Sequence, residues 1–224
     1  MQGYRTRARM SRPARRRIGG AVLTVSVLLA CALHPAGAAR AVPQGGAYPA
    51  REVLDAFRIA CADLGNLDTA KAGVVAAGWT LVADPSTTPL GGLVATSEKL
   101  GGSYAQKTGG SLSPMTVYTN DIAGERVHLI LSGVTSEGRT VNACRLYDVD
   151  EQRRIAPATV TQWIGKPPVQ ESDRKELVRA TWEPGMSPAH DSFELYHVPA
   201  DSPVVQMTRV AGLAMKADQV EKAK

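Results

Sequence analysis

The segment that most constrains this chain is its first 38 residues, which have the three parts of a bacterial secretory signal peptide. Residues 1–17 hold seven arginines and no acidic residue. An apolar run follows from Ile18 to Leu33, and Ala36-Gly37-Ala38 offers a small-residue cleavage site. This order predicts export and removal of residues 1–38. The mature chain is therefore expected to fold in the periplasm or outside the cell.

The N-terminal sequence also allows other interpretations. Leu28-Leu29-Ala30-Cys31 resembles a lipobox, in which case Cys31 would carry a lipid anchor. Arg15-Arg16-Arg17 would suit a twin-arginine export route, and Ala39-Arg40-Ala41 is a second small-residue cleavage site. The apolar run is about 16 residues long, shorter than the roughly 20 that cross a bilayer. We therefore expect no transmembrane segment in the mature chain.

Loss of the signal peptide reverses the charge of the protein. The whole chain has 26 Lys and Arg residues against 21 Asp and Glu, a net charge of +5. Without the seven arginines of the signal, 19 basic residues face 21 acidic ones, a net charge of −2. The mature sequence has no basic stripe of the kind that binds nucleic acid, so we expect no nucleic-acid partner.

Only two cysteines, Cys61 and Cys144, follow the signal peptide. An oxidising compartment favours a disulfide between them. Cys61 lies on the apolar stripe of a helical pattern, and Cys144 shares a strand face with Leu146. The sequence predicts a bridge from the first helix to the sheet. Neither cysteine has a neighbouring His or Cys, so a metal-binding or catalytic role is not indicated.

The remaining pattern predicts a single α+β domain, with two N-terminal helices and one further helix packed on a mainly antiparallel sheet. Helices are expected over 49–64, 68–77 and 158–164. Strands are expected over 79–83, 115–119, 126–133, 140–148, 177–182, 192–198 and 205–215. The turns at 120–124 and 136–138 have hairpin composition. Glycines and prolines punctuate residues 84–113, where we expect a loop with one helical turn over 94–100.

These elements give the expected organisation of the chain. Residues 39–48 form a flexible lead-in, residues 49–215 form the domain, and residues 216–224 form a charged tail. A mature chain of about 186 residues is long enough for one domain with its own core.

The sequence holds a few arrangements that could carry chemistry. Lys107-Thr108-Gly109 spells a box of serine β-lactamases, but its partner would have to be Thr96-Ser97-Glu98-Lys99, which has Thr where the nucleophilic serine belongs. His190, Asp191, Glu194 and His197 form the densest set of metal-ligand types, yet strand alternation sends them to different faces. We expect His128 to be a core or sheet-face residue. The carboxylates of Asp148, Asp150 and Glu151 are expected to lie in a solvated turn.

A few positions form a recognisable layout: Phe57 and Cys61 in the first predicted helix, Ala77-Gly78-Trp79 at the end of the second, and Cys144 in a later strand. This layout resembles that of a loosely related, uncharacterised group of small exported proteobacterial proteins. The resemblance implies an α+β fold with a helix-to-sheet bridge, and it implies no activity.

No set of residues indicates a catalytic site, a cofactor site or a metal site, so none is predicted. The sequence favours a non-catalytic binding or accessory module of the cell envelope, with a protein, a peptide or an envelope component as its partner. Its site is expected on the sheet face or in residues 84–113, because long loops often carry function. The alternatives are a small extracytoplasmic hydrolase or envelope-modifying enzyme, with its site there or around 190–197, and an inhibitor or immunity-type protein.

Overall fold

The computed structural model describes residues 46–221, all of them within one compact unit. The predicted signal peptide, Cys31 of the alternative lipobox and most of the predicted lead-in lie outside the described residues. Nowhere between residues 46 and 221 is a helix both long and apolar enough to cross a membrane.

Residues 46–221 form five α-helices, one 3-10 helix and nine strands. Its elements are α1 (Ala50–Ala60), α2 (Leu67–Ala76), β1 (Thr80–Leu81), the 3-10 helix η1 (Pro85–Thr87), α3 (Gly91–Lys107), β2 (Ser111–Leu112), β3 (Thr116–Ile122), β4 (Glu125–Ser136), β5 (Arg139–Val149), α4 (Pro157–Ile164), β6 (Gln170–Arg174), β7 (Leu177–Trp182), β8 (Ser192–Val198), α5 (Val205–Thr208) and β9 (Gly212–Val220).

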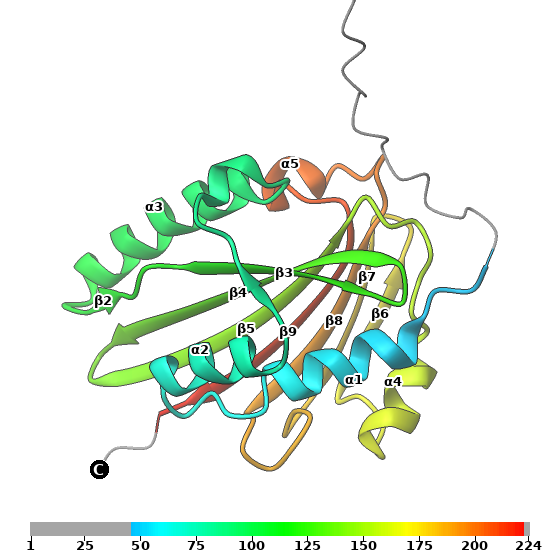
Figure 1. Cartoon of the computed structure of the whole chain (residues 1–224), viewed down its shortest axis with the longest axis horizontal. Coiled ribbons are helices and arrows are strands. Elements are labelled where there is room, and N and C mark those ends of the chain that lie inside the picture. The colour runs from blue at the N-terminus through cyan, green and yellow to red at the C-terminus, as the bar shows by residue number, and fades with distance from the viewer. Residues whose placement is uncertain (1–45, 222–224) are drawn as a thin grey trace, which may run out of the picture. The chain divides into compact units, whose positions relative to one another are not determined.

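All nine strands join one antiparallel sheet, which confirms the predicted α+β class. The order is β1-β3-β4-β5-β9-β8-β7-β6, and β2 pairs with the far end of β4. Helices α1, α2 and α4 lie on one face of the sheet, and α3 and α5 lie on the other (Figure 1). We call the first the helix face and the second the groove face. The last strand of the chain, β9, lies in the middle of the sheet between β5 and β8.

Two hairpins follow the predicted turn chemistry and set the register of β3, β4 and β5. Ile122 pairs with Glu125, so Ala123 and Gly124 alone make the first turn, with φ angles of 50° and 94°. Glu137 and Gly138 make the second, with φ angles of 52° and 73°. Two successive residues with positive φ match the right-handed twist of the paired strands. These tight turns fix which side chains of β4 and β5 reach each face.

The main core lies on the helix face, where an aromatic cluster joins helices to strands. Phe193 of β8 lies 5.9 Å from Phe57 of α1 and 5.7 Å from both Trp163 of α4 and Trp182 of β7, measured between ring centroids. The predicted disulfide is present: Cys61 follows α1 and is bonded to Cys144 of β5, with their Cα atoms 5.9 Å apart. Both cysteines are fully buried. The bridge ties the helix layer to the centre of the sheet.

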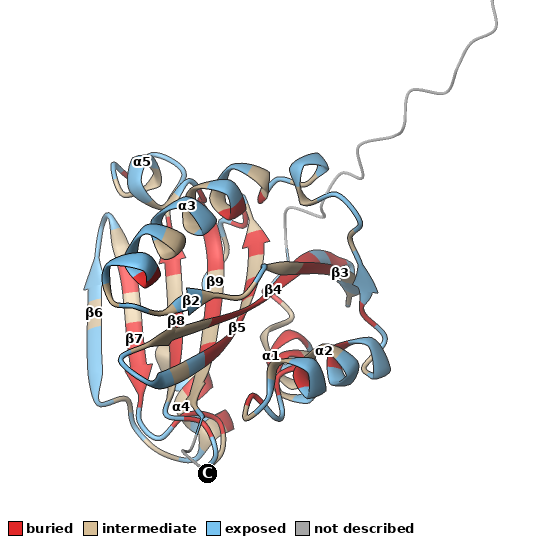
Figure 2. Cartoon of the chain, turned by 90° about the vertical axis from the view of Figure 1, so that its left-hand side faces the viewer, coloured by how far each residue is buried: buried red, intermediate tan, exposed pale blue. Residues whose placement is uncertain are grey.

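The structure corrects three predictions. Residues 84–113 are not a loop, because α3 occupies 17 of them. The run 205–215 is not one strand, because α5 precedes β9. The charged tail begins later than predicted, because residues 216–220 complete β9 and pair with both β5 and β8. Edge strand β6, which Figure 2 shows as mostly exposed, was also missed.

Candidate functional site

The structure scatters the histidines that the sequence marked as candidate ligands, and all three are buried. His128 is on the groove face of β4. On β8, His197 points to the helix face, where its Nε2 lies 3.1 Å from the carbonyl oxygen of Glu151, whereas Glu194 points to the groove face. β8 is an interior strand of the sheet, between β9 and β7.

His190 makes the one serine–histidine contact among these residues. Its Nδ1 lies 2.9 Å from Oγ of Ser187, and its Nε2 lies 2.8 Å from the carbonyl oxygen of Cys61. Ser187 also accepts a hydrogen bond from the backbone N–H of Ala189, and the N–H of His190 donates to the carbonyl of Ser187. These contacts close a tight turn before β8. The Ser187–His190 pair therefore stabilises this turn and connects it to the backbone of the disulfide-bonded Cys61.

The β-lactamase-like boxes lie on one helix. Thr96-Ser97-Glu98-Lys99 is in the middle of α3, and Lys107-Thr108-Gly109 is at its C-terminal end, where Thr108 donates to the carbonyl of Tyr104. A nucleophile and its partners on one helix axis cannot surround a substrate, so this resemblance carries no site.

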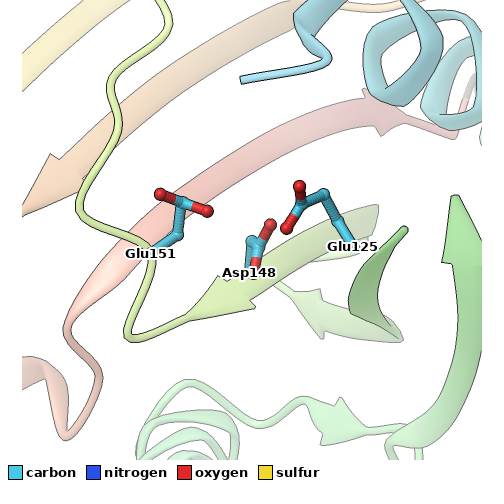
Figure 3. Close-up of side chains that lie close together, drawn as sticks. All are labelled: Glu125, Asp148 and Glu151. Atoms are coloured by element: carbon cyan, nitrogen blue, oxygen red, sulfur yellow. The ribbon is translucent and has the colours of Figure 1, made fainter. Parts of the chain in front are cut away.

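Three carboxylates converge at one end of the sheet: Glu125 from β4, Asp148 from β5 and Glu151 from the segment after β5. Each offers an oxygen within 4.8 Å of the others, and all three are buried (Figure 3). Within residues 46–221, this is the one group of three or more His, Cys, Asp or Glu side chains close enough to share a cation. The prediction of a solvated turn is wrong for Asp148 and Glu151, and it missed Glu125.

The backbone after β5 explains this convergence. Asp150 adopts a positive φ of 65°, a conformation that Asp tolerates better than most residues, and the chain reverses there. Gly212 of β9 has a φ of 106°, and a Cβ at this position would meet the carbonyl oxygen of Asp148 at 2.3 Å. Only glycine permits this close approach. The turn returns Glu151 to the side of Asp148.

An arginine pairs with two of the three carboxylates. The Arg153 guanidinium lies 2.9 Å from Glu125 and also forms an ion pair and hydrogen bonds with Glu151. Tyr48 donates a hydrogen bond to Asp148 at 2.9 Å, which anchors the end of the predicted lead-in. Burial raises the pKa of Asp148 to about 7, and the negative charges of Glu151 and Glu125 add to this shift. Arg153 pairs with two of the three carboxylates and Tyr48 donates to the third, so these contacts hold β4, β5 and the N-terminal segment together.

The groove face carries a different feature, a groove between α3, α5 and the sheet. It consists of two adjoining cavities of about 290 and 250 Å³ that share Leu93 of α3 and Tyr147 of β5. The larger, under α3, has polar groups on its wall, among them Ser97, Ser132 and Arg145. The smaller, near α5, is lined almost wholly by apolar side chains, including Leu177, Val198, Val204 and Val210.

Strand register lays out the floor of this groove. Ile130, Arg145, Lys216 and Glu194 are consecutive partners across β4, β5, β9 and β8. The next row along the strands is His128, Tyr147, Ala214 and Tyr196. Arg145 and Tyr147 are two residues apart on one strand, which separates them by about 7 Å along β5. The polar and apolar cavities thus follow each other along β5.

On the sheet around these rows, Lys216 and Arg179 pair with acids, whereas Arg145 does not. Lys216 lies 3.1 Å from Glu194 and 2.6 Å from Asp218, and Arg179 lies 2.8 Å from Glu194. Arg145, which is half-buried, donates a hydrogen bond to the neutral Ser132 hydroxyl at 2.7 Å. Among residues 46–221 it forms no ion pair. Three cations and two acids leave one positive charge uncompensated, and it is the one that borders the groove.

Tyr147 stands where the two cavities meet. Burial raises its pKa, so its hydroxyl keeps its proton at neutral pH and can donate a hydrogen bond. No other side chain in the described part of the chain makes a hydrogen bond with this hydroxyl. A ligand in the groove would therefore meet a guanidinium and a phenol on the same strand.

The roof of the groove is a helix with few anchors. Of the 17 residues of α3, only Val94 and Ala105 are buried, and no side chain caps its N-terminus. It contains four glycines, two of which, Gly92 and Gly102, have open space where a Cβ would lie. Glycine in a helix costs about 1 kcal/mol relative to alanine. Because α3 has small residues and few buried side chains facing the sheet, space remains between this helix and the strands.

Sequence reasoning pointed to residues 84–113 and the sheet face but missed the residues that form the site. The usable signal was in β5, where Cys144 and Leu146 alternate with Arg145 and Tyr147. If the cysteine face is the core, the other two side chains lie together on the opposite face. Comparison with known proteins adds nothing to this assignment, since no family model, curated protein or solved structure matches the chain.

Proposed function

We propose that this protein is an exported, non-catalytic binding module whose ligand site is the groove between α3, α5 and the sheet. The observation that carries the proposal is the pair of adjoining cavities that meet at Leu93 and Tyr147. Small-ligand sites are concave and mostly apolar, with a few fixed polar groups, as this groove is. The compartment follows from the predicted signal peptide and agrees with the disulfide.

A binding role fits the groove better than catalysis. A hydrolase needs a nucleophile, a base and a group that stabilises developing charge around one reacting atom. The groove offers hydroxyls and a guanidinium, while the serine–histidine pair of Ser187 and His190 borders neither cavity. His128, in the floor row next to Tyr147, has a lowered pKa because it is buried, which weakens it as a base.

The test is whether a bound small molecule depends on the groove. We would express the full chain with export, purify the mature protein without denaturation and extract bound molecules for untargeted mass spectrometry. Ala214→Phe would fill the floor of the smaller cavity, and Val169→Phe, at an exposed position outside it, is the matched control. We expect a stoichiometric molecule from the wild type and the control but not from Ala214→Phe. Equal recovery from all three would place the site elsewhere and refute the proposal.

A further inference from the structure

The two ends of the groove differ in chemistry in a way that identifies the class of ligand. The larger cavity contains Arg145 and the Ser97 and Ser132 hydroxyls, and the smaller is bordered mainly by aliphatic side chains. A ligand that matches both ends has a charged head and an apolar tail. The sign of the head follows from Arg145, whose guanidinium has no acidic partner within residues 46–221.

A guanidinium held by one neutral hydroxyl has donors left over. Arginine carries five N–H donors in a planar fork that matches a carboxylate through two parallel hydrogen bonds. One of them is used on Ser132. The acids on this face, Glu194 and Asp218, are bound by Lys216 and Arg179 and are not free to reach Arg145. The excess of a single positive charge suits a head with a single negative charge.

The smaller cavity sets the size of the tail. At about 30 Å³ for each group of the size of a water molecule, 250 Å³ holds about eight such groups. Its floor continues from Tyr147 to Ala214 and Gly212, and its roof includes Val204 and Val210. A chain of about ten carbons fits if the carboxylate carbon and its neighbour lie beside Arg145 in the larger cavity and the other eight fill this volume.

We propose that the groove binds a medium-chain fatty carboxylate, with the carboxylate on Arg145 and the Tyr147 hydroxyl and the acyl chain in the apolar cavity. This inference rests on the proposed function, because it assigns a ligand to the same groove. It narrows the expected envelope component to a single-chain, monoanionic lipid.

The head group is tested with three probes of equal tail length on the mature wild-type protein: decanoate, decanol and decyltrimethylammonium, each below its critical micelle concentration. Isothermal titration calorimetry measures their affinities. A hydrogen-bonded charge contributes about 1.5–3 kcal/mol, so we expect decanoate to bind about 10- to 150-fold more tightly than decanol. The cationic probe should bind most weakly. Equal binding of all three would overturn the inference.

Substitutions then locate the head and the tail. Arg145→Met should lower the affinity for decanoate to that for decanol and leave decanol within about twofold, while Arg145→Lys should fall between, because lysine keeps the charge without the fork. An unchanged decanoate affinity in Arg145→Met would overturn the assignment of the head. Lengthening the tail should raise affinity by about fourfold per methylene until the cavity is full.

The same series separates failure of this inference from failure of the proposed function. Ala214→Phe should weaken decanoate and decanol alike, and Val169→Phe should weaken neither. Tight binding that Ala214→Phe leaves intact would refute the groove itself. Binding of decanol as strong as that of decanoate, with both lost in Ala214→Phe, would keep the groove as the site and refute the anionic ligand. Tighter binding of a trileucine peptide with a free carboxylate would refute the acyl tail.

Discussion

Replacing Asp148 with asparagine should change how the stability of this protein depends on pH. Asp148 lies between Glu125 and Glu151, is 6 % exposed and accepts a hydrogen bond from Tyr48. Burial, reinforced by the two neighbouring carboxylates, raises its pKa from 3.8 to about 7. Asparagine keeps the shape of the side chain and an oxygen that can accept from Tyr48, and it cannot ionise.

The expected magnitude follows from this pKa difference. Because the folded-state pKa is above the unfolded one, the folded state holds a proton that the unfolded state has lost at intermediate pH. Asp148 therefore contributes most to stability below pH 3.8, and this contribution falls as pH rises, until it is gone above about pH 7. A difference of about three pKa units at 1.36 kcal/mol each gives a loss of about 4 kcal/mol.

Other groups titrate in the same range, so the informative quantity is the difference between wild type and variant. His128 and His197 have pKa values lowered by burial, and they make the protein more stable as pH rises toward 6.5. Their contributions cancel in the difference. Urea unfolding followed by circular dichroism, from pH 4 to pH 8 under non-reducing conditions, gives the free energy of unfolding of each protein.

We expect Asp148→Asn to gain about 4 kcal/mol relative to wild type between pH 4 and pH 8. Asp150→Asn is the matched control, since Asp150 is exposed and asparagine also tolerates its positive φ. The pH-dependent change for Asp148→Asn should clearly exceed that for this control. A flat difference for Asp148→Asn, or a loss of stability with rising pH, would refute our account of the carboxylate cluster.

Three further predictions concern the framework around the groove. Cys61→Ser should lower the free energy of unfolding by about 4–5 kcal/mol, because the bridge closes a sequence separation of 83 residues. Equal free energies of unfolding for the variant and the non-reduced wild type would contradict this. Arg153→Met should lower the free energy of unfolding in urea at pH 7 by about 3–5 kcal/mol, because it leaves Glu125 and Glu151 buried without a cation. The control Arg154→Met removes an exposed ion pair and should lower it by less than about 1 kcal/mol. Gly102→Ala should stabilise the protein by about 1 kcal/mol, since nothing lies within 4 Å of the added Cβ. Gly91→Ala should destabilise it, because its Cβ would lie 2.9 Å from the backbone of Ser86. Melting curves that rank the two variants the other way would refute this description of α3.

The predictable part of the fold rests on periodicity and turn chemistry. Strand β4 is a largely apolar run, β5 alternates in burial, and the glycines at 124 and 138 mark the two-residue turns that join them to their neighbours. The disulfide was predictable because Cys61 and Cys144 each lie on the apolar face of its own element. Local patterns with one dominant period carry this information directly.

Helix α3 was not predictable from local signals, because its four glycines and absent N-cap argue against a helix. It exists because Leu90 and Val94 pack into the smaller core formed with Val117, Ile130 and Val210. Tertiary contacts from distant strands override local propensity here. The same holds for the carboxylate cluster, where Glu125 and Asp148 come from strands whose register is set elsewhere.

The most direct test of the central claim is a crystal structure of the mature protein purified natively from cells that export it. We expect elongated density in the groove, beginning within hydrogen-bonding distance of Arg145, passing Tyr147 and ending among Val198, Val204 and Val210. Helix α3 should remain above it. A groove closed by direct packing of α3 on the sheet, or a ligand bound to another face of the protein, would contradict the account.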